Sequence, residues 1–500
     1  MTALPISPNT PKPYTGHKIH FIGAGGCGMS GLAEFVLREG GGVSGSDMKD
    51  SAACAKLKGL GAAIQIGHQA ENIPLGTELV VASAAIKPDN VEMIEARRRA
   101  IPVQKYAAFL GTLMELRKGI AISGTHGKST TAAMVSYALT CAGLEPSFVI
   151  GAEAPQLGGG SRVGAGPHLV VEACEYDRSF HNYRPHAAAI LNIEEDHLDY
   201  YRDLAEIRQA FAEFAAGIVP GGLLVANGAD IGVREIAEQI RANSSAGVTV
   251  QTFGIGGERG QWDWHAENLE ADQGRFTFDV YDQGALFISV RLALAGRHNV
   301  LNALATMALC RWAGAPAQVV ADSLGTFHGA SRRMEVRGQA AGVTVVDDYA
   351  HHPTEICATL KAVKARFEPK RLWVVFQPHQ HSRTRFFLKD FALALAVADR
   401  IVVPDIYFVR DSEKERQAVS SLDLVAEVQR LGADGVYIKE FDSIRRYLVE
   451  SLGPGDVLMT MGAGDIWRLA EPLLADLGGA TPSGGMGTAA PGTPADKDAS

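Results

Sequence analysis

Short apolar runs rich in β-branched residues alternate with helix-like segments along most of the chain. Runs without alternating polar residues are typical of strands buried on both faces, as in parallel sheets covered by helices. The pattern therefore predicts an α/β fold. The clearest runs lie at 17–23, 78–83, 118–123, 168–173, 187–193, 221–226, 371–376 and 400–404.

The chain is long enough for several domains, since its 500 residues exceed the roughly 100–200 residues of one domain. Two glycine-rich strand-to-helix turns begin at Gly23 and Gly124, and a third α/β block follows near the C-terminus. We therefore expect three domains. Their predicted limits are 1–116, 117–326 and 327–479.

Two segments depart from the α/β alternation. Within 247–295 the strand-like runs are closer together and separated by Gly and Asp, which predicts a small antiparallel β region in the central domain. Residues 480–500 contain no large apolar residue except Met486, so a disordered tail is expected there.

Composition and charge exclude several classes of protein. The net charge of −9 argues against a nucleic-acid or anionic-membrane partner, which would require a basic surface. None of the six cysteines forms a C-x-x-C pair, so neither a zinc ribbon nor a disulfide framework is expected. With no secretory signal and no run near the ~18–20 apolar residues of a membrane span, a cytoplasmic protein is predicted. Monomer and dimer both stay open.

The first glycine loop has the pattern G-x-G-x-x-G, formed by Gly23, Gly25 and Gly28 between a predicted strand and a predicted helix. Glycines let the backbone approach a pyrophosphate, and the helix N-terminus offers free N–H groups. Asp47, at the end of the next strand-like run, could hold a ribose hydroxyl. This unit fits NAD and a UDP-sugar equally well, and a tight turn without a ligand is the alternative.

The second glycine loop, Gly124 to Thr130, reads GTHGKST and follows the run at 118–123. Its first glycine spacing differs from G-x4-G-K-[ST], but the G-K-S end is intact. Lys128 can reach phosphate oxygens, and Ser129 can bind Mg²⁺. We predict a phosphate-binding loop, with a turn of no such role as the alternative.

Acidic residues and a histidine follow two predicted strands near this loop. Glu172 ends the run at 168–173, and His197 follows the run at 187–193. Ligands of a phosphate-bound Mg²⁺ lie at such strand ends in doubly wound sheets. We predict that both residues bind metal, whereas a helix cap or a solvated loop is the alternative for any single carboxylate.

Later segments resemble, in order, the blocks of the Mur ligase family. GTHGKST is similar to its phosphate loop, and the GAGGCGMS loop with GSD resembles the N-terminal signature of the branch that adds alanine to muramate. The resemblance covers residues 17–472. The remaining blocks are EACEYDRSF, NIEEDHLDYY, GRHNVLNALA, HGASRRMEVRG, DDYAHHPTE, FQPHQHSRTR and GAGDIWRL.

The resemblance implies a Rossmann-like UDP-binding domain, a central P-loop ATPase domain and a Rossmann-like C-terminal domain that binds the amino acid. It implies ATP-dependent joining of L-alanine to the carboxylate of UDP-N-acetylmuramate through an acyl phosphate, in peptidoglycan synthesis, with ATP and Mg²⁺ as cofactors.

The resemblance also implies roles for individual residues. The ATP-binding residues would be Gly124, Thr125, His126, Gly127, Lys128, Ser129, Thr130, His298, Asn299, Asn302, Arg332 and Asp347. The substrate-binding residues would be Gly23, Gly25, Gly28, Met29, Ser46, Asp47, His68, Ser83, Glu175 and Tyr349. The metal ligands would be Ser129, Glu172 and His197, and the catalytic residues Lys128, His197, His352 and Arg383. His352 could take the proton of the amine or only position its loop.

Two features refine this interpretation. No lysine occurs from 129 to 360, so a carbamoylated lysine of the kind expected in later-acting Mur ligases has no candidate in the central domain. Gln380 stands where many relatives have Arg, so Arg383 or Arg385 would have to supply the cationic contact.

Three alternative functions remain from the sequence. The first is a related ligase that attaches a preformed tripeptide to UDP-N-acetylmuramate. The second is an NAD-dependent oxidoreductase, predicted from the first loop alone. The third is a nucleotide-dependent binding protein without catalysis.

Overall fold

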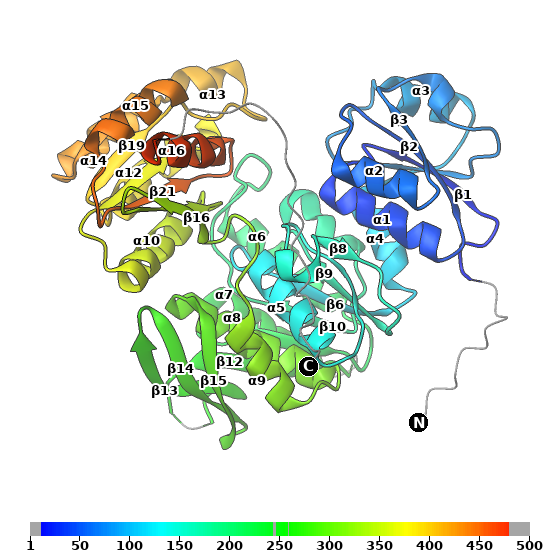
Figure 1. The fold of residues 1–500 in the computed structure, drawn as a ribbon. Helices are drawn as coiled ribbons and strands as arrows, with labels where there is room; N and C mark the ends of the chain where they lie inside the picture. The colour runs from blue at the N-terminus through cyan, green and yellow to red at the C-terminus, as the bar shows by residue number, and fades with distance from the viewer. Residues whose placement is uncertain (1–11, 244–246, 259, 480–500) are drawn as a thin grey trace, which may run out of the picture.

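The computed structural model describes residues 12–243, 247–258 and 260–479. They form three α/β bodies, each built on its own sheet (Figure 1). The predicted disordered tail at 480–500 lies outside these residues. Among the described helices, none is both long enough and apolar enough to cross a bilayer.

The first sheet has five parallel strands in the order β3-β2-β1-β4-β5. The first glycine loop joins β1 to helix α1, at the centre of this sheet. The strands are β1 Lys18–Ile22, β2 Gly42–Asp47, β3 Ala63–Ile66, β4 Leu79–Ala82 and β5 Val103–Lys105. The helices are α1 Cys27–Arg38, α2 Ala52–Gly59, α3 Val91–Arg98 and α4 Tyr106–Met114, with a 3₁₀ turn η1 at Ala70–Asn72.

The central sheet has ten strands in the order β15-β14-β13-β12-β11-β10-β6-β9-β7-β8. Its strands are β6 Lys118–Ser123, β7 Ser147–Val149, β8 Ser161–Arg162, β9 His168–Glu172, β10 Ala187–Ile190, β11 Leu223–Asn227, β12 Thr249–Ile255, β13 Trp264–Asp272, β14 Arg275–Asp282 and β15 Ala285–Ala295. Its helices are α5 Lys128–Cys141, α6 Leu204–Ala216, α7 Ile231–Ala242, α8 Arg297–Trp312 and α9 Ala317–Thr326, with 3₁₀ turns η2 Pro155–Leu157 and η3 Tyr176–Asn182.

The antiparallel region is smaller than the sequence predicted. Strand β12 pairs in parallel with both β11 and β13, so that part of the prediction for 247–295 is wrong. Only β13, β14 and β15 pair antiparallel there, and they extend the central sheet at one edge (Figure 1). Strand β13 was not predicted from the sequence, because its Glu, Asn and Asp residues interrupt any apolar run.

The third sheet has six strands in the order β16-β17-β21-β18-β19-β20, with only the β16–β17 pair antiparallel. The strands are β16 Glu335–Ala340, β17 Val343–Asp348, β18 Leu372–Phe376, β19 Arg400–Val403, β20 Gly435–Tyr437 and β21 Val457–Met461. The helices are α10 Pro353–Phe367, α11 His381–Phe386, α12 Leu388–Leu395, α13 Glu413–Ala418, α14 Ser421–Arg430, α15 Phe441–Ser451 and α16 Ala470–Leu477, with a 3₁₀ turn η5 at Ile466–Leu469.

The predicted three-domain α/β architecture is therefore confirmed, and each of the strand-like runs at 17–23, 118–123 and 371–376 forms a strand. The exact domain limits stay a prediction. The break at 116–117 falls between α4 and β6, and the break at 326–327 falls at the end of α9.

The first body packs on the central body through a shared apolar core. Phe109 and Leu110 of α4 belong to the same buried cluster as Phe180 of η3 and Phe214 of α6. Gly111 is the point of closest approach, because a Cβ at this position would lie 2.2 Å from the carbonyl oxygen of Asn182. Close packing of α4 on η3 therefore requires a residue without a side chain.

We predict that Gly111→Ala lowers the free energy of unfolding by about 1–3 kcal/mol, the usual cost of forcing extra atoms into a packed contact. The measurement is the thermal unfolding temperature by circular dichroism. Gly59→Ala in α2 is the matched control, since nothing lies within 4 Å of its Cβ position and helical Ala is favoured over Gly. Equal unfolding temperatures for the two variants would contradict the packing argument.

Candidate functional site

The second glycine loop connects the central strand β6 to α5, at the carboxyl ends of parallel strands. Gly124 and Gly127 both have positive φ, +143° and +82°. A Cβ at Gly124 would lie 2.9 Å from Leu191 Cβ, and one at Gly127 would lie 2.9 Å from Asn302 Oδ1. Both the short contacts and the backbone conformation therefore require glycine at these positions. The loop leads directly into the N-terminus of α5, and helix N-termini favour bound anions.

Lys128 begins α5 and folds back over this loop. Its Nζ donates to the carbonyl oxygens of Gly124 and Thr125, at 2.6 and 2.9 Å, and to both carboxylate oxygens of Glu175, at 3.1 and 2.9 Å. Burial disfavours the ammonium, but the Glu175 carboxylate outweighs burial and holds the pKa of Lys128 above its ordinary value. Lys128 is therefore a fixed positive charge inside the loop.

Predicted Mg²⁺ ligands surround the same loop. Strand β6 lies between β9 and β10, so Ser129, Glu172 and His197 come from neighbouring strand ends. The hydroxyl and carboxylate are hard oxygen donors that suit Mg²⁺. Glu172 Oε2 already accepts the N–H of Gly151 at 2.9 Å, which fixes its orientation.

His197 lies beside the Glu175 carboxylate. Its Nε2 lies 3.6 Å from Glu175 Oε1, and its buried Nδ1 has no hydrogen-bond partner among the described residues. The donor chemistry therefore fits a magnesium ion best through Ser129 and Glu172, with His197 at the edge of the site.

A cavity of about 390 Å³ lies between the central and third bodies, beside the phosphate loop. His298, Asn299 and Asn302 of α8 line it, as predicted for a nucleotide pocket, together with Gly127 and Thr130. Burial lowers the pKa of His298 to about 4, so its ring is neutral at physiological pH. Asn299 and Asn302 hydrogen-bond to each other and so hold their amides in place.

Arg332 and Asp347 were expected at this cavity, but their immediate neighbours line it. Arg333 and Asp348 are on the cavity wall, and Arg332 and Asp347 are not. Arg332 Nε instead donates to Asp347 Oδ2 at 2.9 Å, and its Nη2 donates to the carbonyl of Gly462. Successive side chains of a strand point to opposite faces. Asp347 and Asp348 are neighbours in β17, so one pairs with Arg332 and the other lines the cavity.

Tyr349, predicted to bind substrate, lies close to both of these arginines. The guanidinium groups of Arg332 and Arg333 lie 5.1 and 5.3 Å from its ring centroid, within cation–π range. Its ring also meets His351 edge-on. Tyr349 thus contacts both Arg332, which is held in the ion pair with Asp347, and Arg333, which lines the cavity.

A second cavity of about 400 Å³ is lined by residues 195–199 of the central body and by Gln380 and Arg383 of the third body. Arg383 is not free, because its Nη2 donates to the buried Asp196 carboxylate at 2.6 Å. Burial opposes ionisation of Asp196, but Arg383 outweighs burial and holds the pKa of this carboxyl well below its usual range. The side-chain amide of Gln380 makes a long contact, 3.5 Å, to Asp199 Oδ2.

His352 caps α10, and both of its ring nitrogens are engaged. Its Nε2 donates to the carbonyl oxygen of Glu195 at 3.0 Å, and its Nδ1 accepts the N–H of Thr354 at 3.3 Å. Burial lowers the pKa of His352, which keeps the ring neutral. This arrangement favours the positioning role over proton abstraction.

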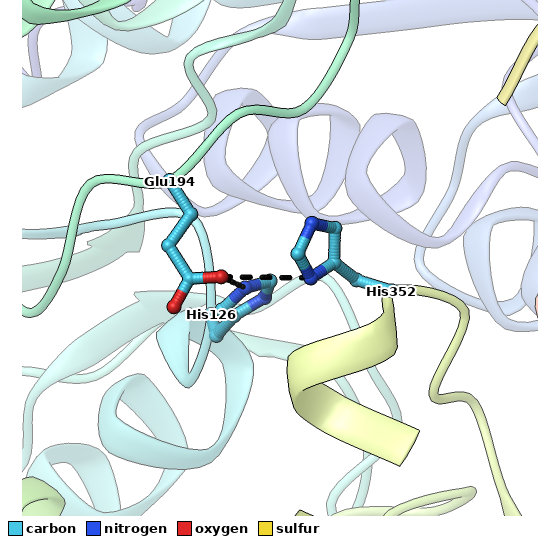
Figure 2. Close-up of side chains that lie close together, drawn as sticks. All are labelled: His126, Glu194 and His352. Carbon is cyan, nitrogen blue, oxygen red and sulfur yellow. Dashed lines mark hydrogen bonds and ion pairs between the residues drawn. The ribbon is translucent and has the colours of Figure 1, made fainter. Parts of the chain in front are cut away.

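His126, Glu194 and His352 converge at the cavity rim (Figure 2). His126 Nε2 lies 3.3 Å from Glu194 Oε2, and its Nδ1 lies 3.2 Å from Glu355 Oε1. Burial opposes protonation, but the two carboxylates raise the pKa of His126 to about 9. Glu194 and Glu355 were not predicted as site residues, since neither follows a recognisable spacing.

The first glycine loop is held by Asp47, which was expected to bind a ribose. Asp47 Oδ2 accepts the N–H of Gly25 at 2.9 Å, and Oδ1 accepts the N–H of Lys49. Gly28 is required by contact, because its Cβ would lie 2.6 Å from the Tyr106 hydroxyl. At the same strand ends lie Gly23 and Ser83, while Met29 is buried in α1.

A buried carboxylate that the sequence did not reveal organises this end of the sheet. Glu92 of α3 is fully buried and accepts hydrogen bonds from Ser46 Oγ, the Gln69 N–H and the Asn72 amide, at 2.6, 3.1 and 2.7 Å. Ser46 Oγ also lies 2.9 Å from His68 Nδ1. Two predicted substrate residues, Ser46 and His68, are thus positioned by Glu92.

Comparison with known proteins agrees with this arrangement of domains. Residues 18–118 match the family model of the Mur ligase family catalytic domain, residues 122–310 that of the Mur ligase middle domain, and residues 332–464 that of the Mur ligase glutamate ligase domain.

Curated relatives and solved structures extend the match to nearly the whole chain. The chain is 42% identical to the UDP-N-acetylmuramate–L-alanine ligase of Caldanaerobacter subterraneus over 91% of this chain and 97% of that one. It is also 42% identical to the enzyme of that name from Clostridium novyi, with the same coverage of each chain.

Among solved structures, the UDP-N-acetylmuramate-alanine ligase MurC of Thermotoga maritima superimposes with a TM-score of 0.74 at 29% identity, covering 92% of this chain and 98% of that one. A murein peptide ligase from Psychrobacter arcticus shares the fold at 24% identity and a TM-score of 0.67, with 94% and 100% of the chains covered. With all three domains matched in order and over 40% identity to curated relatives, this chain belongs to the Mur ligase family.

Proposed function

We propose that this chain joins L-alanine to the carboxylate of UDP-N-acetylmuramate with hydrolysis of ATP to ADP and phosphate, in peptidoglycan synthesis. The observation that carries the proposal is the 42% identity to UDP-N-acetylmuramate–L-alanine ligases across all three domains. The phosphate loop beside an interdomain cavity supports the ATP-dependent part of it.

The proposed chemistry proceeds in two steps. A carboxylate oxygen of the muramoyl group attacks the γ-phosphorus of ATP, ADP leaves, and an acyl phosphate forms. The amine nitrogen of alanine then attacks the acyl carbon, phosphate leaves with the bonding electron pair, and the amine loses a proton. Lys128, and Arg333 at the cavity wall, supply positive charge for the transferred phosphoryl group.

Magnesium would be held by Ser129 and Glu172, with His197 beside them. When bound there it would neutralise charge on the phosphate oxygens. The third domain would exclude water from the acyl phosphate, since Arg383 and His352 fasten it to residues 195 and 196 at the site.

A cytoplasmic location remains a prediction of this proposal. So does the expectation that the protein acts on small molecules and binds no nucleic acid.

The alternatives receive less support. An NAD-dependent oxidoreductase would leave the second glycine loop and the cavity beside it without a function. A tripeptide-attaching ligase shares the fold, as the murein peptide ligase comparison illustrates, but the curated relatives compared here carry the alanine ligase name.

The experiment that tests the proposal measures phosphate release by the purified protein with ATP, Mg²⁺ and UDP-N-acetylmuramate, with and without L-alanine. We expect release only when all components are present, with UDP-N-acetylmuramoyl-alanine identified by mass. Release that requires a tripeptide in place of alanine would assign the chain to the recycling ligases, and no release with either would overturn the proposal.

Lys128→Ala should lower the rate of phosphate release by roughly 10²–10³-fold or more, because the loop loses its fixed positive charge at the transferred phosphoryl group. Binding of UDP-N-acetylmuramate, measured by calorimetry, should remain close to normal. Lys118→Ala is the matched control, since Lys118 is an exposed lysine at the other end of β6. Near-normal turnover by Lys128→Ala would refute the role of this loop.

Substitution of the two adjacent arginines should separate nucleotide binding from folding. Arg333→Met should raise the KM for ATP by roughly 10–100-fold, the value of a charge-assisted hydrogen bond, with little change in unfolding temperature. Arg332→Met should instead destabilise the protein by about 3 kcal/mol, because the buried Asp347 loses its partner. A raised KM for ATP in Arg332→Met, with destabilisation in Arg333→Met, would instead support Arg332 as the ATP-binding residue.

Glu92→Gln should weaken binding of UDP-N-acetylmuramate about tenfold, because an amide cannot accept all the hydrogen bonds that orient Ser46 and His68. The KM for ATP should not change. Glu95→Gln, on the same helix, is the control, since Glu95 pairs with Arg98 and Arg99 away from the glycine loop. Equal effects of the two substitutions would show that Glu92 serves only stability.

A further inference from the structure

Three side chains from separate parts of the chain converge at the rim of the nucleotide cavity (Figure 2). His126 belongs to the phosphate loop, Glu194 follows β10, and His352 precedes α10 of the third body. One ligand atom from each lies within 4.8 Å of the other two. The cluster therefore bridges the central and third bodies.

Two of the three distances within the cluster are close to the edge of a tetrahedral zinc site. Bonds of about 2.0–2.1 Å in tetrahedral geometry place neighbouring ligand atoms about 3.3–3.4 Å apart. His126 Nε2 and Glu194 Oε2 are 3.3 Å apart, and His352 Nδ1 and Glu194 Oε2 are 3.6 Å apart. All three ligand atoms lie within 4.8 Å of one another, so the remaining distance would have to shorten by at most about 1.5 Å for one cation to be bound by all three.

The outer nitrogens of the two imidazoles are already oriented as in metal sites. His126 Nδ1 faces the Glu355 carboxylate at 3.2 Å, and His352 Nε2 donates to the Glu195 carbonyl at 3.0 Å. Thr354 Oγ1 donates to Glu194 Oε2 at 2.6 Å. Such partners fix the tautomer and direction of metal-binding imidazoles. The inner nitrogens therefore point toward Glu194.

We propose that His126, Glu194 and His352 form a binding site for a zinc-class divalent cation, separate from the magnesium site at Ser129 and Glu172. Two imidazole nitrogens and one carboxylate oxygen suit Zn²⁺ or Co²⁺, whereas Mg²⁺ prefers oxygen ligands alone. The cation replaces the proton on His126 and the long hydrogen bond from the Thr354 N–H to His352.

A cation at this site would fasten the third domain to the phosphate loop. His126, Glu194, Thr354 and Glu355 all line the nucleotide cavity, so the cation would sit at its rim. Because the three ligands come from both bodies, binding selects the closed arrangement and slows its opening. Zinc would then act as a reversible clamp on the enzyme.

The site is tested with Co²⁺ and Zn²⁺ as probes, on the full-length protein without substrates and with Mg²⁺ in excess. Co²⁺ should give the intense visible absorption of tetrahedral coordination, and equimolar Zn²⁺ should abolish that absorption and raise the unfolding temperature. Glu194→Gln and His352→Asn should each weaken the cation affinity at least tenfold. His351→Asn, which leaves the three ligands in place, should retain it.

Further variants keep the outcome unambiguous. Thr354→Val removes only the hydroxyl that orients Glu194, and should weaken the cation affinity by roughly 10–100-fold if the direct substitutions fail to fold. His197→Asn should retain the cobalt absorption, which separates this site from the magnesium ligands. Absence of tetrahedral absorption, or unchanged affinity in Glu194→Gln, would mean that the cluster is only an ion pair of His126 with its carboxylates. Since no substrate is present, this result is independent of the proposed ligase activity.

Discussion

The buried ion pair between Arg383 and Asp196 is the contact on which the site depends. It joins α11 of the third body to the segment that follows β10, and both side chains are almost fully buried. Removing one partner of such a pair leaves an uncompensated charge at a cost of about 3–5 kcal/mol. His352 and Thr354 add hydrogen bonds to the same segment. This contact therefore helps to hold together the two bodies whose residues line the cavity beside the second glycine loop.

Some of the strained backbone positions lie near the contact between the central and third bodies. His197, Arg332 and Gln380 all have positive φ, +54°, +59° and +70°, although none is glycine. Each such conformation costs about 1–3 kcal/mol and persists only where the surroundings impose it. Arg332 is held by Asp347 and the Gly462 carbonyl, and Gln380 lies buried at the start of α11. Arg332 and Gln380 belong to the third body, and His197 belongs to the segment of the central body that lines the second cavity together with Gln380.

The charges around the phosphate loop are balanced before any nucleotide arrives. Lys128 is paired with Glu175, and His126 lies between Glu194 and Glu355. A phosphate that reaches the loop must therefore replace carbonyl and carboxylate contacts of Lys128, so that binding exchanges partners rather than creating an isolated charge. The Glu175 carboxylate thus keeps the buried Lys128 charged before a phosphate binds.

Local sequence determined the elements and the loops of this protein. Uninterrupted apolar runs identified strands such as β6, β9 and β18, because a strand buried on both faces leaves no other pattern. The glycines at 124 and 127 were predictable because sterics at a strand-to-helix turn accept no other residue. Only the tertiary structure decided which of two adjacent residues lines the cavity. Arg333 and Asp348 line it, whereas Arg332 and Asp347 do not. The tertiary structure also decided that Glu92, Glu194 and Glu355 matter, because their partners are distant in the chain and only tertiary packing, within a domain or between two domains, brings them close together.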